Sequence, residues 1–368
     1  MRSPELKFSR KLKPDLKSKI EKNYGKLILK RKAEQKRSDA RIETKLRELN
    51  RLSKKLIGRN ELKLYAQLYT KHKLACESER LRLLGKKSET SSIFLRHRAA
   101  FRNELEKNIP GIRKLNQKRS QLFGEFSKGG GVRPSNKLGT IRGISANLLE
   151  ILERFEFNDP TAVSIEPPYH FTENRIDIIY DNFNSLNHDS LADADSGLLI
   201  HNINSYHEDN AWFTHKAAKY EAHAGFGVNY TMPVTGTVSV DVLLQNLYNK
   251  NLVSITDNSG FSEGWATLEN KLYMNILHPS NIVPFEIELN KIDMSTGGDD
   301  KTVTDINKID TEFAKWINFR STGSFTAGTD LQILVGNKES LYNILDDMQC
   351  SSETLYSWFV RKIVVRAV

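Results

Sequence analysis

The sequence predicts an α+β protein in which an elongated helical half and an antiparallel β-sandwich follow one another along the chain. Residues 1–140 contain 39 Lys and Arg against 14 Asp and Glu, whereas residues 141–368 contain 16 against 31. The spacing of apolar residues also changes, from three and four residues in the first half to two in the second. Three consecutive glycines at 129–131 separate the two patterns. The net charge of +10 therefore combines a basic half and an acidic half.

Helical periodicity covers most of the first half. Ile42, Leu49 and Leu56 are seven residues apart, as in a coiled-coil seam, and good helix formers surround them. Glycines at 58 and 85 break the pattern, so we expect helices at about 14–57, 60–84, 88–110 and 112–123. A narrow apolar stripe cannot bury a thick core by itself. The pattern therefore predicts a helical hairpin or coiled-coil bundle that another copy or another protein completes.

The glycine run predicts a flexible joint, because consecutive glycines are costly to hold in a helix. We therefore expect a basic helical stalk at 1–126, a Gly-rich hinge at 127–140 and an acidic β-sandwich at 141–368. A short helix, capped by Ser145, should lead into the sandwich. The hinge lacks the GxxxxGK[ST] pattern of a phosphate-binding loop.

Alternating apolar residues in the second half predict strands. Val238, Val240, Val242 and Leu244 face one way, with polar residues between them. At least seven such segments occur without long intervening helices, which favours an antiparallel, jelly-roll-like sandwich over a parallel α/β enzyme. The expected segments are 175–180, 197–203, 224–230, 236–244, 265–277, 284–289, 331–335 and 358–368.

The basic residues of the first half allow three interpretations. They could form a solvated helix face, bind a phosphate-rich surface through electrostatics, or dock onto an acidic protein surface, for which the acidic half of the same chain is a candidate. Few aromatic residues accompany them, which argues against recognition of single strands by stacking. The candidate side chains for binding a polyanion or a partner are Lys54, Lys55, Arg59, Arg113, Lys114, Lys118 and Arg119.

Neither half presents a recognisable catalytic or metal-binding pattern. His201, His207, His215 and His223 are six to eight residues apart, unlike the tight pairs of zinc sites. Acidic turns at 193–197 and 297–300 carry oxygen ligands but do not match an EF-hand loop. The GxSxG-like run at 260–264 precedes a strand, whereas a nucleophile elbow leads into a helix. We therefore expect no enzyme activity, no resident metal and no cofactor.

Three aromatic residues are candidates for ligand binding by the sandwich: Tyr206, Trp212 and Phe213 lie in a polar stretch. Such residues in sandwich loops can hold a sugar or a protein, although a core position is the commoner role for a Trp.

The function that these patterns favour is a non-enzymatic structural or interaction protein. A helical stalk would oligomerise, and the sandwich would recognise or assemble with another protein, as in tail, capsid, adhesin or delivered toxin-like proteins. The alternative is a nucleic-acid-associated protein whose basic helices hold phosphate backbones, or another anionic surface, without sequence specificity. No apolar run is long enough to span a membrane, and the first residues lack the apolar stretch of a secretory signal. We therefore expect synthesis in the cytoplasm, with release or incorporation into a particle left open.

Overall fold

The fold is described from a computed structural model of the chain. The described residues are 5–9, 12–82, 90–129, 156–210, 213, 215–257, 263–296, 301–307 and 313–368.

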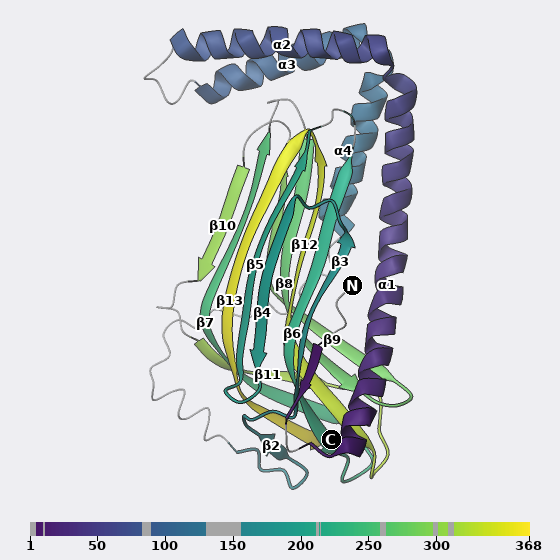
Figure 1. The fold of residues 1–368 in the computed structure, drawn as a ribbon, viewed down its shortest axis with the longest axis vertical. Coiled ribbons are helices and arrows are strands. Elements are labelled where there is room, and N and C mark those ends of the chain that lie inside the picture. The colour runs from purple at the N-terminus through teal and green to yellow at the C-terminus, as the bar shows by residue number, and fades with distance from the viewer. Residues whose placement is uncertain are drawn as a thin grey trace.

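The predicted helical region is confirmed as four helices, which Figure 1 shows in purple and blue. The first is a continuous 43-residue helix, about 65 Å long at about 1.5 Å per residue. Pro14 opens this helix, since a proline in the first turn forfeits no intrahelical hydrogen bond. The bounds are α1 Pro14–Leu56, α2 Arg59–Arg82, α3 Thr90–Asn108 and α4 Ile112–Gly129.

The second half forms two antiparallel sheets, as predicted. Sheet A has the order β1-β3-β6-β12-β8-β9, and sheet B has the order β10-β7-β13-β5-β4, with β11 beside β7 and β2 beside β13. The strands are β1 Glu5–Phe8, β2 Val163–Ile165, β3 Phe171–Tyr180, β4 Ser185–Asp193, β5 Leu198–Asp209, β6 Lys216–Thr231, β7 Val238–Asp257, β8 Glu263–Leu277, β9 Ile282–Thr296, β10 Lys301–Asn307, β11 Phe313–Arg320, β12 Asp330–Asp346 and β13 Met348–Ala367.

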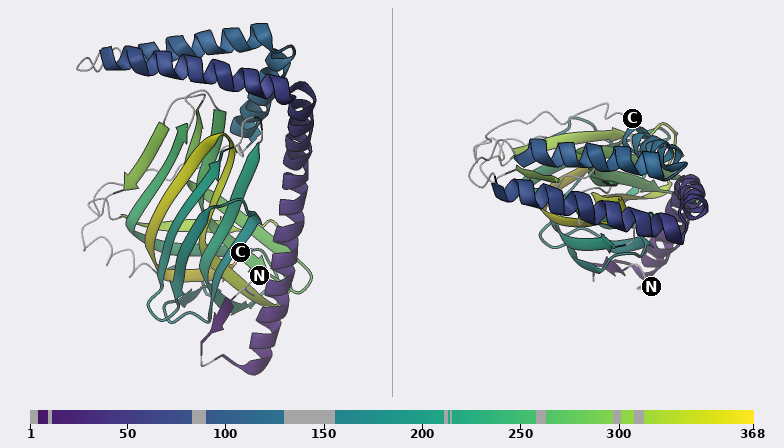
Figure 2. Two further views of the ribbon diagram at one scale, coloured as in Figure 1. Left: turned by 45° about the horizontal axis from the view of Figure 1, so that its top comes forward. Right: turned by 90° about the horizontal axis from the view of Figure 1, so that it is seen from above.

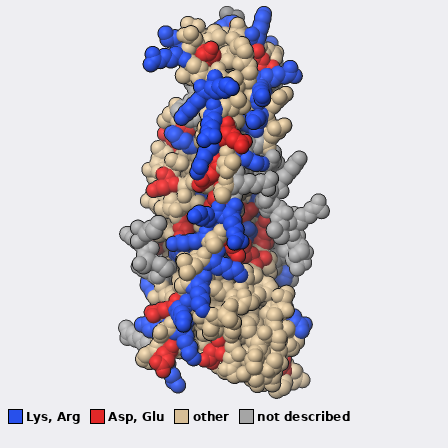
Figure 3. All heavy atoms as spheres, turned by 90° about the vertical axis from the view of Figure 1, so that its right-hand side faces the viewer, with Lys and Arg blue, Asp and Glu red and all other residues tan. Residues whose placement is uncertain are grey.

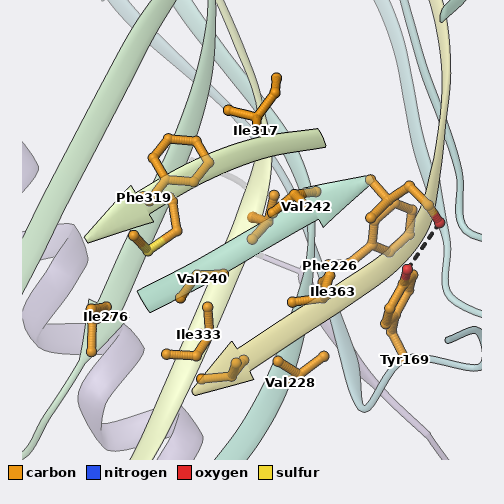
Figure 4. Packing of buried hydrophobic residues seen from close by; sticks show 14 of the residues in the cluster. Tyr169, Phe226, Val228, Val240, Val242, Ile276, Ile317, Phe319, Ile333 and Ile363 are labelled. Atoms are coloured by element: carbon orange, nitrogen blue, oxygen red, sulfur yellow. Dashed lines mark hydrogen bonds between the residues drawn. The ribbon is translucent and has the colours of Figure 1, made fainter. Parts of the chain in front are cut away.

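The two sheets pack face to face around an apolar core. Alternating residues of β6 and β12, such as Phe226, Val228 and Ile333, meet Val240 and Val242 of β7, as Figure 4 shows. The period-two pattern therefore predicted correctly which side chains point inward.

Helices α1 and α4 lie along the outer face of sheet A, whereas Figure 2 shows α2 and α3 running across one end of the sandwich. The first half of α1 buries Ile20, Tyr24 and Leu27 against Phe171 and Leu334. Further along the chain, the second half of α1 joins α2, α3 and α4 in an apolar cluster that includes residues of β8 and β12. The apolar stripe of α1 is thus covered by the chain's own sheet.

Two elements of the structure cross the boundaries expected between the halves. Residues 5–8 form β1, which precedes the helices and pairs with β3 at the edge of sheet A. The last helix continues to Gly129, three residues into the expected hinge. The remainder of that hinge and the expected helix before the sandwich lie outside the described residues. The division into domains, the coiled-coil packing and the jelly-roll connectivity stay predictions.

Candidate polyanion-binding surface

Most of the basic residues predicted to bind a polyanion lie at the corner where α1 meets α2 and α3 meets α4. Lys54 and Lys55 end α1, and Arg59 begins α2. The two turns touch, because a Cβ on Gly111 would lie 2.8 Å from the Leu56 side chain. Glycine also suits this position because its φ is +90°. Exposed basic side chains from both turns therefore share this corner; they are Lys54, Lys55, Arg59, Arg113, Lys114 and Lys118.

Arg119 differs from the other predicted residues because it is buried. Its Nη1 lies 2.6 Å from Asp346 Oδ2, and its Nε lies 3.0 Å from Glu263 Oε2. Arg102 also binds Glu263, at 2.6 Å. Burial raises the pKa of Asp346 to about 7, although the Arg119 charge opposes the shift. Arg119 therefore fastens α4 to the end of sheet A and is not on the surface that a polyanion could reach.

The side of α1 that faces away from the sandwich carries many exposed basic side chains. At about 100° per residue, its exposed Lys and Arg project opposite the apolar stripe. Figure 3 shows these side chains in blue along the length of the molecule. We call this set the basic face; it comprises Lys22, Lys26, Lys36, Arg37, Arg47, Arg51, Lys54 and Lys55.

Acidic side chains compensate little of this charge. The exposed acids of α1 are Asp15, Glu21, Glu34 and Glu48. Within the basic face, Arg47 pairs with Glu43 at 2.6 Å, and Lys26 donates to the carbonyl of Pro279. The other six form no hydrogen bond or ion pair with any residue that the structure describes. Their charge is available to an external partner.

The opposite side of α1 is charged too, but there the charges are paired. The fully buried Glu173 accepts hydrogen bonds from Tyr24 and Tyr273, both at 2.7 Å, and pairs with Arg31 at 2.6 Å. Further along, Asp39 of α1 pairs with Lys219 of β6 at 2.9 Å. These contacts fix the helix on the sheet, so the basic face is held in one direction.

The three aromatic candidates of the sandwich do not form one site. Tyr206 lies in β5 opposite Ser185 of β4 and Ser351 of β13. Phe213 lies instead under the helices, where its ring meets Tyr65 edge to face at 4.8 Å. Trp212 lies outside the described residues. The aromatic ligand site therefore stays a prediction without a shared location for its members.

The surroundings of Phe213 are strained and tightly filled. Its φ is +61°, a conformation that costs a bulky residue energy, and its N–H donates to Asp346 at 2.8 Å. A cavity of about 20 Å³ lies between this ring, Arg119 and Tyr65, with room for about one water molecule. A space of this size cannot hold an organic substrate, so the junction serves to attach the helices.

The four histidines discussed above are all buried. Burial lowers the pKa of His201 to about 4, and burial together with the Arg119 charge lowers that of His215 to about 3. His207 bonds Asn343 inside the sandwich, and His223 also has a lowered pKa because of burial. Among the described residues, no group of three His, Cys, Asp or Glu side chains is arranged to hold a metal ion.

Sequence reasoning missed most of the basic face, although a signal for it was present. Lys22, Lys26 and Lys36 occupy the positions opposite Ile20, Tyr24 and the rest of the apolar stripe. A helical projection of residues 14–56 would have found them. The buried Glu173 had no such signal, because nothing in a single strand sequence shows that a helix will cover its outer face.

No protein-family model and no curated protein sequence matches this chain. Among solved structures, it is similar to TmCBM61 in complex with beta-1,4-galactotriose, with a TM-score of 0.17 and 9% identity over 46% of this chain and 89% of that one. It is also similar to the CBM22-1 xylan-binding domain from Paenibacillus barcinonensis Xyn10C, with a TM-score of 0.11 and 10% identity over 48% and 83%. Similarity at this level carries no argument about function. Within the described residues, no helix is long and apolar enough to cross a membrane.

Proposed function

We propose that this chain is a non-enzymatic interaction protein that binds a polyanion on the basic face and the adjoining corner. The observation that carries the proposal is the contrast between the two sides of α1. Buried charges on one side have partners within the chain, whereas most of the exposed charges on the other side have none among the described residues. Lysine and arginine arrays of this kind attract phosphate or sulfate groups and release the counterions that surround them.

The sandwich contributes rigidity in this proposal. It holds α1 through apolar contacts along the first half and through an ion pair at Asp39. A preorganised array loses less conformational entropy on binding than a flexible basic tail does. The charges are thus presented in fixed relative positions.

Retention of the full chain on heparin tests the proposal. We expect binding at about 50 mM salt and a steep loss of affinity by about 200 mM, as counterion release requires. The Lys36→Glu/Arg37→Glu variant should elute at clearly lower salt. The matched control is Lys7→Glu/Arg320→Glu, which makes the same charge change at exposed strand positions outside the basic face. Equal elution of the two variants, or no retention of the wild type, would reject the proposal.

The proposed function includes self-association, but through a different surface from the apolar stripe of α1. The apolar stripe of α1 is covered by sheet A, so a second copy would have to use another surface. The α2–α3 hairpin extends beyond the sandwich (Figure 2), and Leu74 on it is 57% exposed. A mass measurement across protein concentration, repeated with Leu74→Asp, tests this: a monomer at every concentration contradicts self-association.

A further inference from the structure

The basic face is interrupted at regular intervals along α1. Lys22 and Lys26 form one group, Lys36 and Arg37 a second, and Arg47 with Arg51 a third, which Lys54 and Lys55 extend. The centres of the Lys22/Lys26, Lys36/Arg37 and Arg47/Arg51 pairs are 12 to 13 residues apart, which corresponds to about 19 Å at about 1.5 Å per residue.

Uncharged side chains occupy the intervals along the middle of the face. On the outward side, Leu29 and Ala33 lie between the first and second groups, and Ala40 and Thr44 lie between the second and third. The middle of the face therefore alternates between charged groups and uncharged intervals, with the exposed Lys32 and Glu34 toward the sides of the helix.

This alternation matches a double helix lying alongside α1. A duplex makes one turn every ~34 Å. A helix that lies parallel to the duplex axis meets each of the two phosphate backbones once per turn. Successive backbones therefore face the helix about every 17 Å on average. Charged groups about 19 Å apart can each meet a backbone, while the intervals face the grooves. We propose that the polyanion is double-stranded nucleic acid, bound along α1 through its phosphates; this inference rests on the function proposed above.

Two other phosphate-rich partners fit less well. Single strands are held largely by stacking on aromatic side chains, and the one aromatic residue of α1, Tyr24, is buried and bonded to Glu173. A helix that lies on a membrane inserts its apolar side, but that side of α1 is packed on sheet A. Leu29 is the one large apolar side chain exposed on α1, at 69%, and it has no neighbour of its kind there.

The proposed contact has a defined length. From Lys22 to Lys55 the face spans about 50 Å, which corresponds to ~15 base pairs at ~3.4 Å each. Affinity should rise with duplex length up to that value and then increase slowly. An 8-base-pair duplex, which can meet only part of the face, should bind tenfold or more weakly than one of 16.

A charge-matched variant tests the spacing. Lys36→Ala/Arg37→Ala/Ala40→Lys/Thr44→Lys keeps the net charge and moves the middle group into an interval; all four positions are exposed. Affinity for a 16-base-pair duplex should fall about tenfold, whereas retention on heparin should stay close to wild type because heparin is flexible. Circular dichroism and thermal unfolding confirm that the variant is folded.

The experiment measures fluorescence anisotropy of the full chain with labelled duplex, the matching single strand and vesicles of phosphatidylserine and phosphatidylcholine at one salt concentration. Preference for the duplex, together with the length limit and the loss in the moved-charge variant, supports the inference. Equal binding to all three, or a moved-charge variant as good as wild type, overturns it and leaves polyanion binding in place. A wild-type chain that binds neither heparin nor any of these ligands overturns both proposals.

Discussion

Each of the two faces of sheet A buries one glutamate completely, and the two carboxyl groups have different surroundings. On the outer face, Glu173 has Arg31 and two tyrosine hydroxyls around it. On the inner face, Glu339 accepts one hydrogen bond from Tyr220 at 2.6 Å, and no Lys or Arg among the described residues pairs with it. Burial raises the pKa of Glu339 to about 8, so the side chain is largely protonated at neutral pH.

This difference shows that a charged network helps to attach α1 to the outer face, whereas the Glu339 carboxyl between the sheets has no opposite charge beside it among the described residues. An apolar contact alone would fit many rotations of a helix on a sheet. The ion pair from Arg31 and the hydrogen bond from Tyr24 select one rotation, because both groups of α1 must reach the same carboxylate. The direction of the basic face therefore depends on residues on the opposite side of the same helix.

Removal of the Glu173 carboxylate should have the largest effect on stability. Glu173→Ala leaves the Arg31 charge half-buried and two tyrosine hydroxyls without their acceptor, so we expect a loss of about 3–5 kcal/mol in the free energy of unfolding. Urea unfolding measures it. The exposed Glu48→Ala on the same helix is the control and should change stability by less than about 0.5 kcal/mol. A loss below about 1 kcal/mol for Glu173→Ala would mean that the network does not hold α1.

The next largest effect on stability should come from Leu27, in comparison with Leu29 two residues further along α1. Leu27 is 1% exposed beneath α1, whereas Leu29 is 69% exposed on the outward side. Leu27→Ala should cost about 2–3 kcal/mol through lost burial and a cavity, while Leu29→Ala should be close to neutral. Thermal or urea unfolding of both variants tells whether α1 is docked in solution. Equal, small effects would indicate that the helix is detached.

Local periodicity predicted the elements of this fold well, and long-range contacts account for what it missed. Steps of three and four around Ile42 and Leu49 marked α1, and the alternation at Val238, Val240 and Val242 marked β7. The same stripe was expected to be covered by another copy or another protein. Its actual partner is sheet A, more than 100 residues further along the chain, and no residue pattern within 14–57 specifies that choice.

The candidate polyanion-binding surface was also predicted only in part, because long-range contacts decide which basic residues are exposed. The exposed corner residues Lys54, Lys55 and Arg113 could be proposed from charge alone, because solvated lysines and arginines need no partner. Arg119 has the same local sequence character, yet it is buried because Asp346 and Glu263 lie beneath α4. Charge along a helix predicts which residues can bind a polyanion, but only the tertiary packing separates those that are already paired.

The effect that is smallest at mildly acidic pH, and that grows as pH rises, concerns the Glu339 carboxyl between the sheets. Because the pKa of Glu339 is about 8 in the folded chain and near 4.5 in the unfolded chain, the folded state retains a proton that the unfolded state loses between these values. Wild-type stability should therefore fall as pH rises from about 4.5 to 8. Glu339→Gln keeps a neutral side chain at every pH, so it should equal wild type near pH 4.5 and exceed it by about 2 kcal/mol near pH 6 and about 4 kcal/mol near pH 8, at about 1.4 kcal/mol per pKa unit.

Measuring both proteins at each pH isolates this carboxyl, because other buried groups contribute equally to the two. Asp346, whose pKa is raised to about 7, and His201, whose pKa is lowered to about 4, remain in each. The difference in free energy of unfolding between Glu339→Gln and wild type should increase steadily from about pH 4.5 to 8 and become constant at higher pH. A constant difference from pH 4.5 to 8 would show that Glu339 ionises normally. In that case, water or a cation must compensate its charge between the sheets, and the contrast with Glu173 would disappear.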